Sequence, residues 1–182
     1  LGYDAVTNKA QLYTLAATGS GSGTTYNATS VSATATSMNL GGGNSVGFDF
    51  ISTAKNQIKV TGTNGNTYVM SAVDGTIAAT GSAAPSYASG DVNNSLTAGV
   101  GATAFTNNYY GADAMSQIGY DLLNHTIVRF DSTDWNTLHT VASFGASLLT
   151  TSSVGMDSWY DTTTHSNVIF MVTTNLAGQT AL

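Results

Sequence analysis

Residues 46–71, which read VGFDFISTAKNQIKVTGTNGNTYVMS, decide the fold. The segment contains three short runs of strand-forming residues, and Asn64-Gly65 separates the second run from the third. An Asn-Gly pair favours a tight hairpin turn because both turn positions need positive φ, and Asp74-Gly75 repeats this signal a few residues later. We therefore predict antiparallel strands joined by turns, and no helix, in this segment.

The opening of this segment, V-G-F-D, recurs along the chain with small changes. Similar steps stand at Leu1, Gly99 and Val154, and strand patterns punctuated by Gly, Asn and Asp fill the intervals. The spacing is about 50 residues with about four strands per unit, which is the period of a β-propeller blade. We predict an all-β fold built as a propeller-like stack of four-stranded antiparallel blades, about three and a half of them in this chain. A β-sandwich is the alternative, since its strands have a similar spacing.

The repeat predicts a single β domain over residues 1–182. Its blade-like units are expected near 1–45, 46–98 and 99–153, with an incomplete unit at 154–182. A four-stranded sheet cannot bury both of its faces alone, so the units should stack. For the incomplete unit we favour the explanation that the chain belongs to a longer polypeptide. The alternative is that strands of another chain add to an open sheet edge.

The composition excludes several classes of function. Only 8% of the residues are charged and 42% are hydrophobic, and the net charge is −6. Such a chain should fold, but four Lys and Arg residues cannot form the cationic surface that nucleic acids need. No apolar run is long enough for a membrane-spanning helix, and there are no cysteines for disulfides or thiolate sites. So little charge also does little to prevent self-association.

Four short motifs occur in order along the chain: G-F-D-F at 47–50, I-K-V at 58–60, A-F-T-N-N at 104–108 and I-G-Y-D at 118–121. As a set they resemble the hallmark stretches G-F-D-F-N-P, D-R-I-R-V-V, A-Y-T-N-N and L-Y-G-I-D of an exported bacterial family of unknown function that is predicted to be propeller-like. The resemblance implies the fold and a location outside the cell, at its surface or in the periplasm. It implies no activity.

The chain departs from the family pattern at two places. Ile51-Ser52 stands where the family has N-P, and residues 56–59 read N-Q-I-K where the family has D-R-I-R. Most of the charged positions of the family pattern are therefore neutral in this chain.

Aromatic residues are the first candidates for contact with a ligand or a partner. They are Tyr109, Tyr110, Trp135, Trp159 and Tyr160. Exposed aromatic rings can stack on sugars or form subunit contacts. Packing between blades is the competing explanation, and we favour it for these residues.

A polar loop offers a weaker candidate, a calcium site. Asp91, Asn93 and Asn94 supply hard oxygen ligands. The loop lacks the acidic residues and the glycine of a calcium-binding hand, so we favour a plain polar loop and expect no cofactor. The histidines, His125, His139 and His165, lack metal-binding spacing.

Four aspartates occupy similar positions near predicted strand ends: Asp4, Asp49, Asp121 and Asp157. Equivalent positions in a repeat normally carry a structural residue, so we expect them to hold turns. Two facing carboxylates would instead suit glycoside hydrolysis.

These observations favour a non-enzymatic, extracellular or cell-surface structural protein that acts by self-association, such as a filament or matrix subunit. Its expected partners are copies of itself or other surface components. A carbohydrate-binding module with glycan ligands is the first alternative, and a glycoside hydrolase-like enzyme with paired Asp residues is the second.

Overall fold

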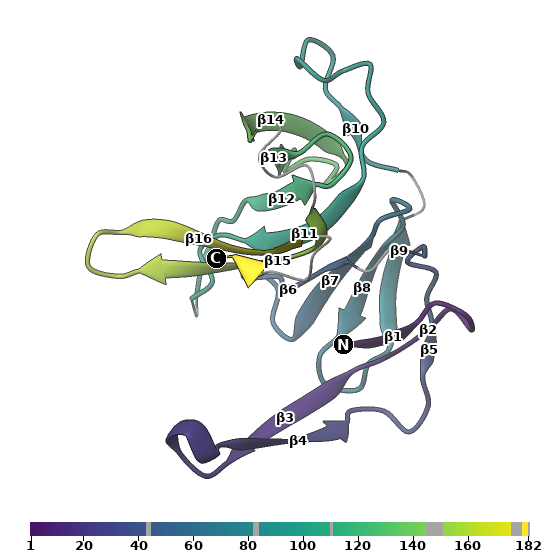
Figure 1. The fold of residues 1–182 in the computed structure, drawn as a ribbon, viewed down its shortest axis with the longest axis vertical. Coiled ribbons are helices and arrows are strands. Elements are labelled where there is room, and N and C mark those ends of the chain that lie inside the picture. Colours follow the sequence, from purple (N-terminus) through teal and green to yellow (C-terminus); the bar gives the residue numbers. More distant parts are fainter. Residues whose placement is uncertain (43–44, 82–83, 110, 145–150, 176–179, 182) are drawn as a thin grey trace.

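The computed structural model describes residues 1–42, 45–81, 84–109, 111–144, 151–175 and 180–181. Over these residues the protein consists of strands, with one 3₁₀ turn, η1 (Gly21–Gly23), and no α-helix (Figure 1). The prediction of an all-β fold is thus confirmed. No helix in these ranges has the length and apolarity to cross a membrane.

The segment at 46–71 forms most of a four-stranded antiparallel sheet, as its pattern predicts. Neighbouring strands pair in chain order, and the turns contain Gly65 at φ 83° and Gly75 at φ 72°. The strands are β6 (Val46–Phe50), β7 (Gln57–Gly62), β8 (Thr67–Ser71) and β9 (Ile77–Gly81).

The next unit forms a five-stranded sheet. Four of its strands pair antiparallel in chain order, and the short β10 adds parallel to β14 at the edge. The strands are β10 (Ser86–Tyr87), β11 (Val100–Phe105), β12 (Gln117–Asp121), β13 (Thr126–Phe130) and β14 (Thr137–Ser143). Because β10 lies within the predicted unit 46–98 and pairs with the following sheet, the units share a strand at this boundary.

The first unit differs from the expected four-stranded blade. It has a three-stranded sheet made of β1 (Gly2–Asp4), β2 (Lys9–Gln11) and β5 (Thr36–Ser37). The strands β3 (Tyr13–Thr18) and β4 (Thr25–Ser30) form a separate hairpin that projects from the body (Figure 1). Every residue of β3 and β4 is exposed, including the large side chains of Tyr13, Leu15 and Tyr26.

The last sheet is built on a long hairpin. It pairs β15 (Thr151–Asp161) with β16 (Ser166–Asn175), and the short β17 (Thr180–Ala181) adds to β16. Side chains alternate along the hairpin, so that Val154, Met156 and Met171 face the body of the protein. The far end of the hairpin extends away from it (Figure 1).

The sheets lie against one another in chain order. One core lies between the first sheet and the β6–β9 sheet, and it includes Met38, Leu40, Ile58 and Val60. Another joins Ala102 and Tyr120 of the β10–β14 sheet to the β15–β16 hairpin. The strand β11 lies alongside both β6 and β15. In the described ranges no sheet closes on itself, so the structure shows stacked layers and does not confirm a propeller, and a sandwich-like description also fits.

The glycine of the repeated opening step has a clear role at one position. A Cβ atom added at Gly47 would lie 2.5 Å from Oγ1 of Thr103, so glycine allows β6 and β11 to approach closely. The next residue, Phe48, packs against the first core. At Gly155 an added Cβ would meet nothing within 4 Å, so the same reason does not extend to every copy of the step.

Candidate functional site

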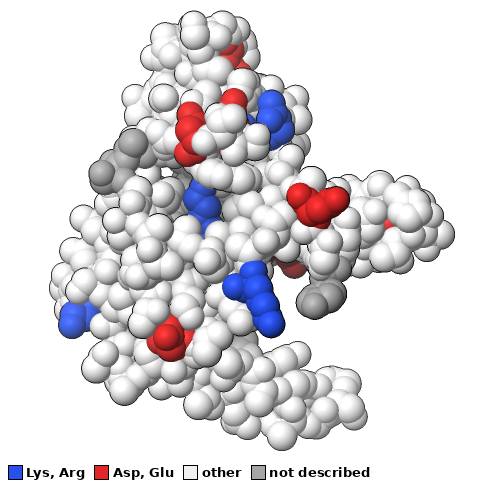
Figure 2. Space-filling model, turned by 180° about the vertical axis from the view of Figure 1, so that it is seen from behind, with Lys and Arg blue, Asp and Glu red and all other residues white. Residues whose placement is uncertain are grey.

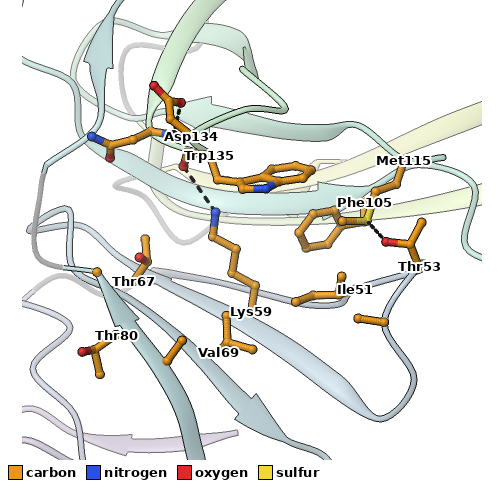
Figure 3. A pocket seen from close by; sticks show the side chains of 14 residues that line it. Ile51, Thr53, Lys59, Thr67, Val69, Thr80, Phe105, Met115, Asp134 and Trp135 are labelled. Atoms are coloured by element: carbon orange, nitrogen blue, oxygen red, sulfur yellow. Dashed lines mark hydrogen bonds between the residues drawn. The ribbon is translucent and has the colours of Figure 1, made fainter.

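A cavity of about 850 Å³ opens between the β6–β9 sheet and the β10–β14 sheet (Figure 3). One wall carries Lys59 and Val69 of the β6–β9 sheet. The other carries Phe105 at the end of β11, Met115 before β12 and Trp135 in the turn between β13 and β14. This volume lies within the range of sites that hold small molecules.

Lys59 is a buried charged side chain in the wall of this cavity. It is only 6% exposed, because β7 is covered on both faces: Ile58 and Val60 face the first core, and Lys59 faces the β10–β14 sheet. Its Nζ donates a hydrogen bond to Oε1 of Gln117 at 2.7 Å. It donates a longer one, at 3.4 Å, to the carbonyl oxygen of Trp135, which Figure 3 shows.

Aromatic rings complete the surroundings of the ammonium group. Nζ of Lys59 lies 5.1 Å from the ring centroid of Phe130 and 5.5 Å from that of Trp135, within the range of cation–π attraction. Burial lowers the pKa of Lys59 to about 8, although the charge of Asp134 opposes this shift. At neutral pH the group is therefore a cation held mainly by neutral dipoles and rings.

The turn from β13 to β14 places Trp135 over the cavity. Asp131 and Asp134 shape this turn by accepting hydrogen bonds from the amides of Thr133, Asn136 and Thr137. Trp135 itself has φ 54°, an unfavourable conformation for a bulky residue that the turn and the packing must hold. Its ring meets Phe105 edge-on at 5.8 Å between centroids.

The predicted aromatic contacts separate into three places. Tyr109 and Tyr160 lie together, with ring centroids 4.5 Å apart, so they pack on each other. Trp135 lines the cavity, and Trp159 is 53% exposed on the β15–β16 hairpin. Tyr110 lies outside the described residues.

The T-N-N motif that follows β11 explains why Tyr109 meets Tyr160. Asn108 accepts a hydrogen bond from the amide of Tyr160 and donates one to the carbonyl oxygen of Ser158. Asn107 and Asn167 exchange two further hydrogen bonds, of 2.7 and 2.9 Å. The motif therefore ties the exit of β11 to the last hairpin, which is a structural role.

The side of the β15–β16 hairpin that faces away from the body carries four large apolar side chains: Trp159, Val168, Phe170 and Val172, with exposures of 53, 37, 43 and 39%. We call these four residues the outer face. Trp159 pairs with Val168 across the two strands, and Asp157 lies opposite Phe170. The outer face is therefore an apolar strip with one carboxylate beside it.

Asp4 and Asp121 hold turns, as expected. Asp4 accepts hydrogen bonds from the amides of Val6 and Thr7. Asp121 is fully buried, and its carboxylate accepts five hydrogen bonds. The donors are the amides of Gly99, Leu123 and Asn124, the side-chain amide of Asn124 and the hydroxyl of Tyr87.

The turns that follow Tyr3, Tyr120 and Tyr160 share one further detail. In each, the tyrosine hydroxyl hydrogen-bonds the side chain five residues later, which is Asn8, His125 or His165. All three of these partners have φ between 52° and 53°. Two of the three histidines are thus parts of repeated turns.

Asp49 and Asp157 play different roles, since neither holds a turn. Asp49 accepts hydrogen bonds from the amides of Phe105 at 2.5 Å and Phe50 at 2.7 Å, which ties β6 to β11. Burial raises the pKa of Asp49 to about 6, although these hydrogen bonds oppose the rise, and the charge of Asp157 adds to it. A raised pKa near a second carboxylate is compatible with a general acid, so the hydrolase alternative stays a prediction.

The polar loop that was the weak calcium candidate is hydrogen-bonded to β14. Asp91 accepts hydrogen bonds from the amide of Thr140 at 2.6 Å, from its hydroxyl at 2.7 Å and from the amide of Asn93, while the side chain of Asn93 donates to the same hydroxyl. The amide of Asn94 bonds the carbonyl of Asp91 and so closes the loop. Burial alone would raise the pKa of Asp91, but these hydrogen bonds lower it. The residues present therefore fit a loop that is hydrogen-bonded to β14 better than they fit a cation site.

The remaining charges are dispersed. Lys and Arg side chains lie apart from one another on the face drawn in Figure 2. Within the described ranges, no group of three His, Cys, Asp or Glu residues could hold a metal ion. His139 lies 3.5 Å from a carboxylate oxygen of Asp131.

Sequence reasoning missed Lys59 and Phe105, which line the cavity, and Gln117, which holds the ammonium group of Lys59. The available signal was Lys59 itself, the one charge in the strand Gln57–Gly62, whose other residues are neutral. Sequence could not pair it with Gln117, which is 58 residues away along the chain.

A family model, described as a domain of unknown function (DUF4394), matches residues 3–181. No curated protein and no solved structure was found to match the chain.

Proposed function

The chain belongs to the DUF4394 family, and from this premise we propose that it is a non-enzymatic structural protein that acts by self-association outside the cell. The outer face is the observation that carries this proposal. Burying four large apolar side chains on one strip of a hairpin is favourable, because it removes their surface from water, and such strips commonly mark interfaces.

A second copy of the chain is the occupant that the surface chemistry favours. The inner side of the same hairpin packs against β11 and β12, so the outer face is the side that stays open to a partner. The net charge of −6 spread over 182 residues gives little repulsion between copies. Two outer faces related by a two-fold axis would bury Trp159 and Phe170 in one contact.

The layered sheets are, in this proposal, blades of a propeller-like arc. Support comes from the first strands of three successive units, β6, β11 and β15, because β11 lies alongside the other two, as inner strands of neighbouring blades do. The outer face is then the side of a blade against which the next blade would pack.

Sedimentation or light scattering over a range of protein concentrations tests self-association. We expect the unaltered chain to shift from monomer toward larger species as concentration rises. Phe170→Asp should abolish this shift, because it places a charge in the apolar contact without touching the core. Val92→Asp, at a residue that is 82% exposed in a loop elsewhere, is the matched control and should associate normally.

A strictly monomeric protein at high concentration would contradict the proposal. So would a Phe170→Asp variant that associates as strongly as the Val92→Asp control.

A carbohydrate-binding module is the second candidate, and the exposed indole of Trp159 favours it. A flat exposed ring is the platform on which sugar rings stack. In this case a glycan array should show selective binding that Trp159→Ala removes, and the protein should bind while it is monomeric. Binding that survives Trp159→Ala would count against this candidate.

A further inference from the structure

The cavity beside Lys59 is the feature that self-association leaves unused. The ammonium group of Lys59 has three hydrogens to donate. Two of them meet neutral acceptors on Gln117 and Trp135, the second at the long distance of 3.4 Å. In the described part of the chain, no carboxylate oxygen lies within 4 Å of Nζ. A buried cation without an anionic partner is costly unless an anion arrives from outside.

The acidic residue in the cavity wall, Asp134, already accepts hydrogen bonds from its own turn. The carboxylate of Asp134 accepts hydrogen bonds from the amides of Asn136 and Thr137 and from the hydroxyl of Thr137, at 2.6 to 2.9 Å. It acts on Lys59 through its field and not by contact. Beside the ammonium, the buried Nε2 of Gln117 also lacks a hydrogen-bond partner among the described residues.

The walls around this cation are mainly apolar. Ile51 and Val69 lie on one side, and Phe105 and Trp135 on the other, with their rings edge-on (Figure 3). A small, strongly hydrated anion would lose its water here and gain a single ammonium in return. A molecule with one carboxylate and a flat apolar body would satisfy both parts of the site.

We propose that this cavity binds a small organic monocarboxylate, whose carboxylate accepts a hydrogen bond from Nζ of Lys59 while its planar body packs against Trp135 and Phe105. One ammonium balances one carboxylate. Gln117 acts as a positioning residue, because its carbonyl oxygen holds Nζ in place.

Calorimetric titration with benzoate tests the site, and benzyl alcohol serves as a neutral aromatic ligand of similar size. Benzoate should bind the unaltered protein more tightly than benzyl alcohol. Lys59→Met keeps the apolar stem and removes the charge, so its Kd for benzoate should rise at least about tenfold, the loss expected for a charge-assisted hydrogen bond. Lys55→Met is the matched control, an exposed lysine in the preceding turn, and should leave the Kd unchanged.

Two measurements on proteins that keep Lys59 guard against misfolding of the variant. The Kd for benzoate should rise at least about tenfold between pH 7 and pH 10, because the ammonium loses its proton in that range. In a Trp159→Phe background Trp135 is the remaining tryptophan, so benzoate should change its fluorescence. Inorganic phosphate at the same concentration should not displace benzoate.

Three results would overturn the proposal: no binding of benzoate to the unaltered protein, equal affinity for benzoate and benzyl alcohol, or the same Kd at both pH values. None of them bears on self-association, which is measured without ligand.

Discussion

Aspartate side chains hold turns both at the surface and in the interior of this protein. Asp4 and Asp161 hold exposed turns, while Asp121 does so inside the protein with five donors around it. A buried carboxylate that is fully hydrogen-bonded is stabilising as a unit, and loss of one acceptor leaves several donors unsatisfied. Aspartate therefore recurs at turns of the repeat, but only some copies are critical.

Asp121→Asn should destabilise the protein by about 2–4 kcal/mol, since one carboxylate oxygen becomes an NH₂ group that faces other donors. Urea unfolding at neutral pH measures the change. The control is Asp161→Asn at an exposed turn of the same type, where we expect a much smaller effect. Equal effects at the two sites would show that burial of Asp121 does not matter.

Asp49 should give stability a distinctive pH dependence. Its pKa is about 6 in the folded protein and near 3.8 in the unfolded chain, so the folded state keeps a proton that the unfolded state has released between these values. The free energy of unfolding should therefore fall as pH rises from about 4 to about 6, and this contribution should be constant above that.

Asp49→Asn should lack this fall, because an amide does not titrate. Its single oxygen can accept a hydrogen bond from only one of the amides of Phe50 and Phe105, which bind different oxygens of Asp49, but that loss is the same at every pH. Relative to the unaltered protein the variant should gain on the order of 1–2 kcal/mol between pH 4 and pH 7, after allowance for solvent screening. Urea unfolding of both proteins across this range measures the gain. A difference that does not change with pH would contradict the account of Asp49.

The contacts between strands and hairpins depend on a few particular residues. The approach of β6 to β11 depends on Gly47, and the attachment of the last hairpin depends on Asn108. In contrast, β3 and β4 project with every residue exposed, and an isolated two-stranded hairpin has little stability of its own. Local strand patterns are equally clear in both cases, so only packing separates core strands from the projecting arm.

Gly47→Ala should destabilise the protein by about 1–3 kcal/mol, because its Cβ would meet the side chain of Thr103 and force β6 and β11 apart. Thermal unfolding measures the effect. Gly155→Ala is the control, since an added Cβ there meets nothing within 4 Å. Adding Thr103→Ala should recover part of the loss, and a double variant no more stable than Gly47→Ala would argue against this contact as the cause.

At the scale of the whole molecule, the stacking of the sheets decides two features. The cavity needs Lys59 from one sheet and Trp135 from the next, and the outer face exists because the last hairpin is covered on one side only. Both proposals therefore follow from stacking. The predicted four-stranded unit appears in full at β6–β9, whereas the first unit divides into a small sheet and an arm.

The sequence by itself determined the all-β class, the hairpin turns at Gly65 and Gly75 and the turns held by Asp4 and Asp121, because these depend on residues close together in the chain. The same expectation was wrong for Asp49 and Asp157, which hold no turn. Only the tertiary structure decided that Lys59 meets Gln117, that Tyr109 packs on Tyr160 while Trp159 faces outward, and that β10 joins the neighbouring sheet. These contacts join residues tens of positions apart, and they depend on how the sheets stack, which alternation along a strand does not encode.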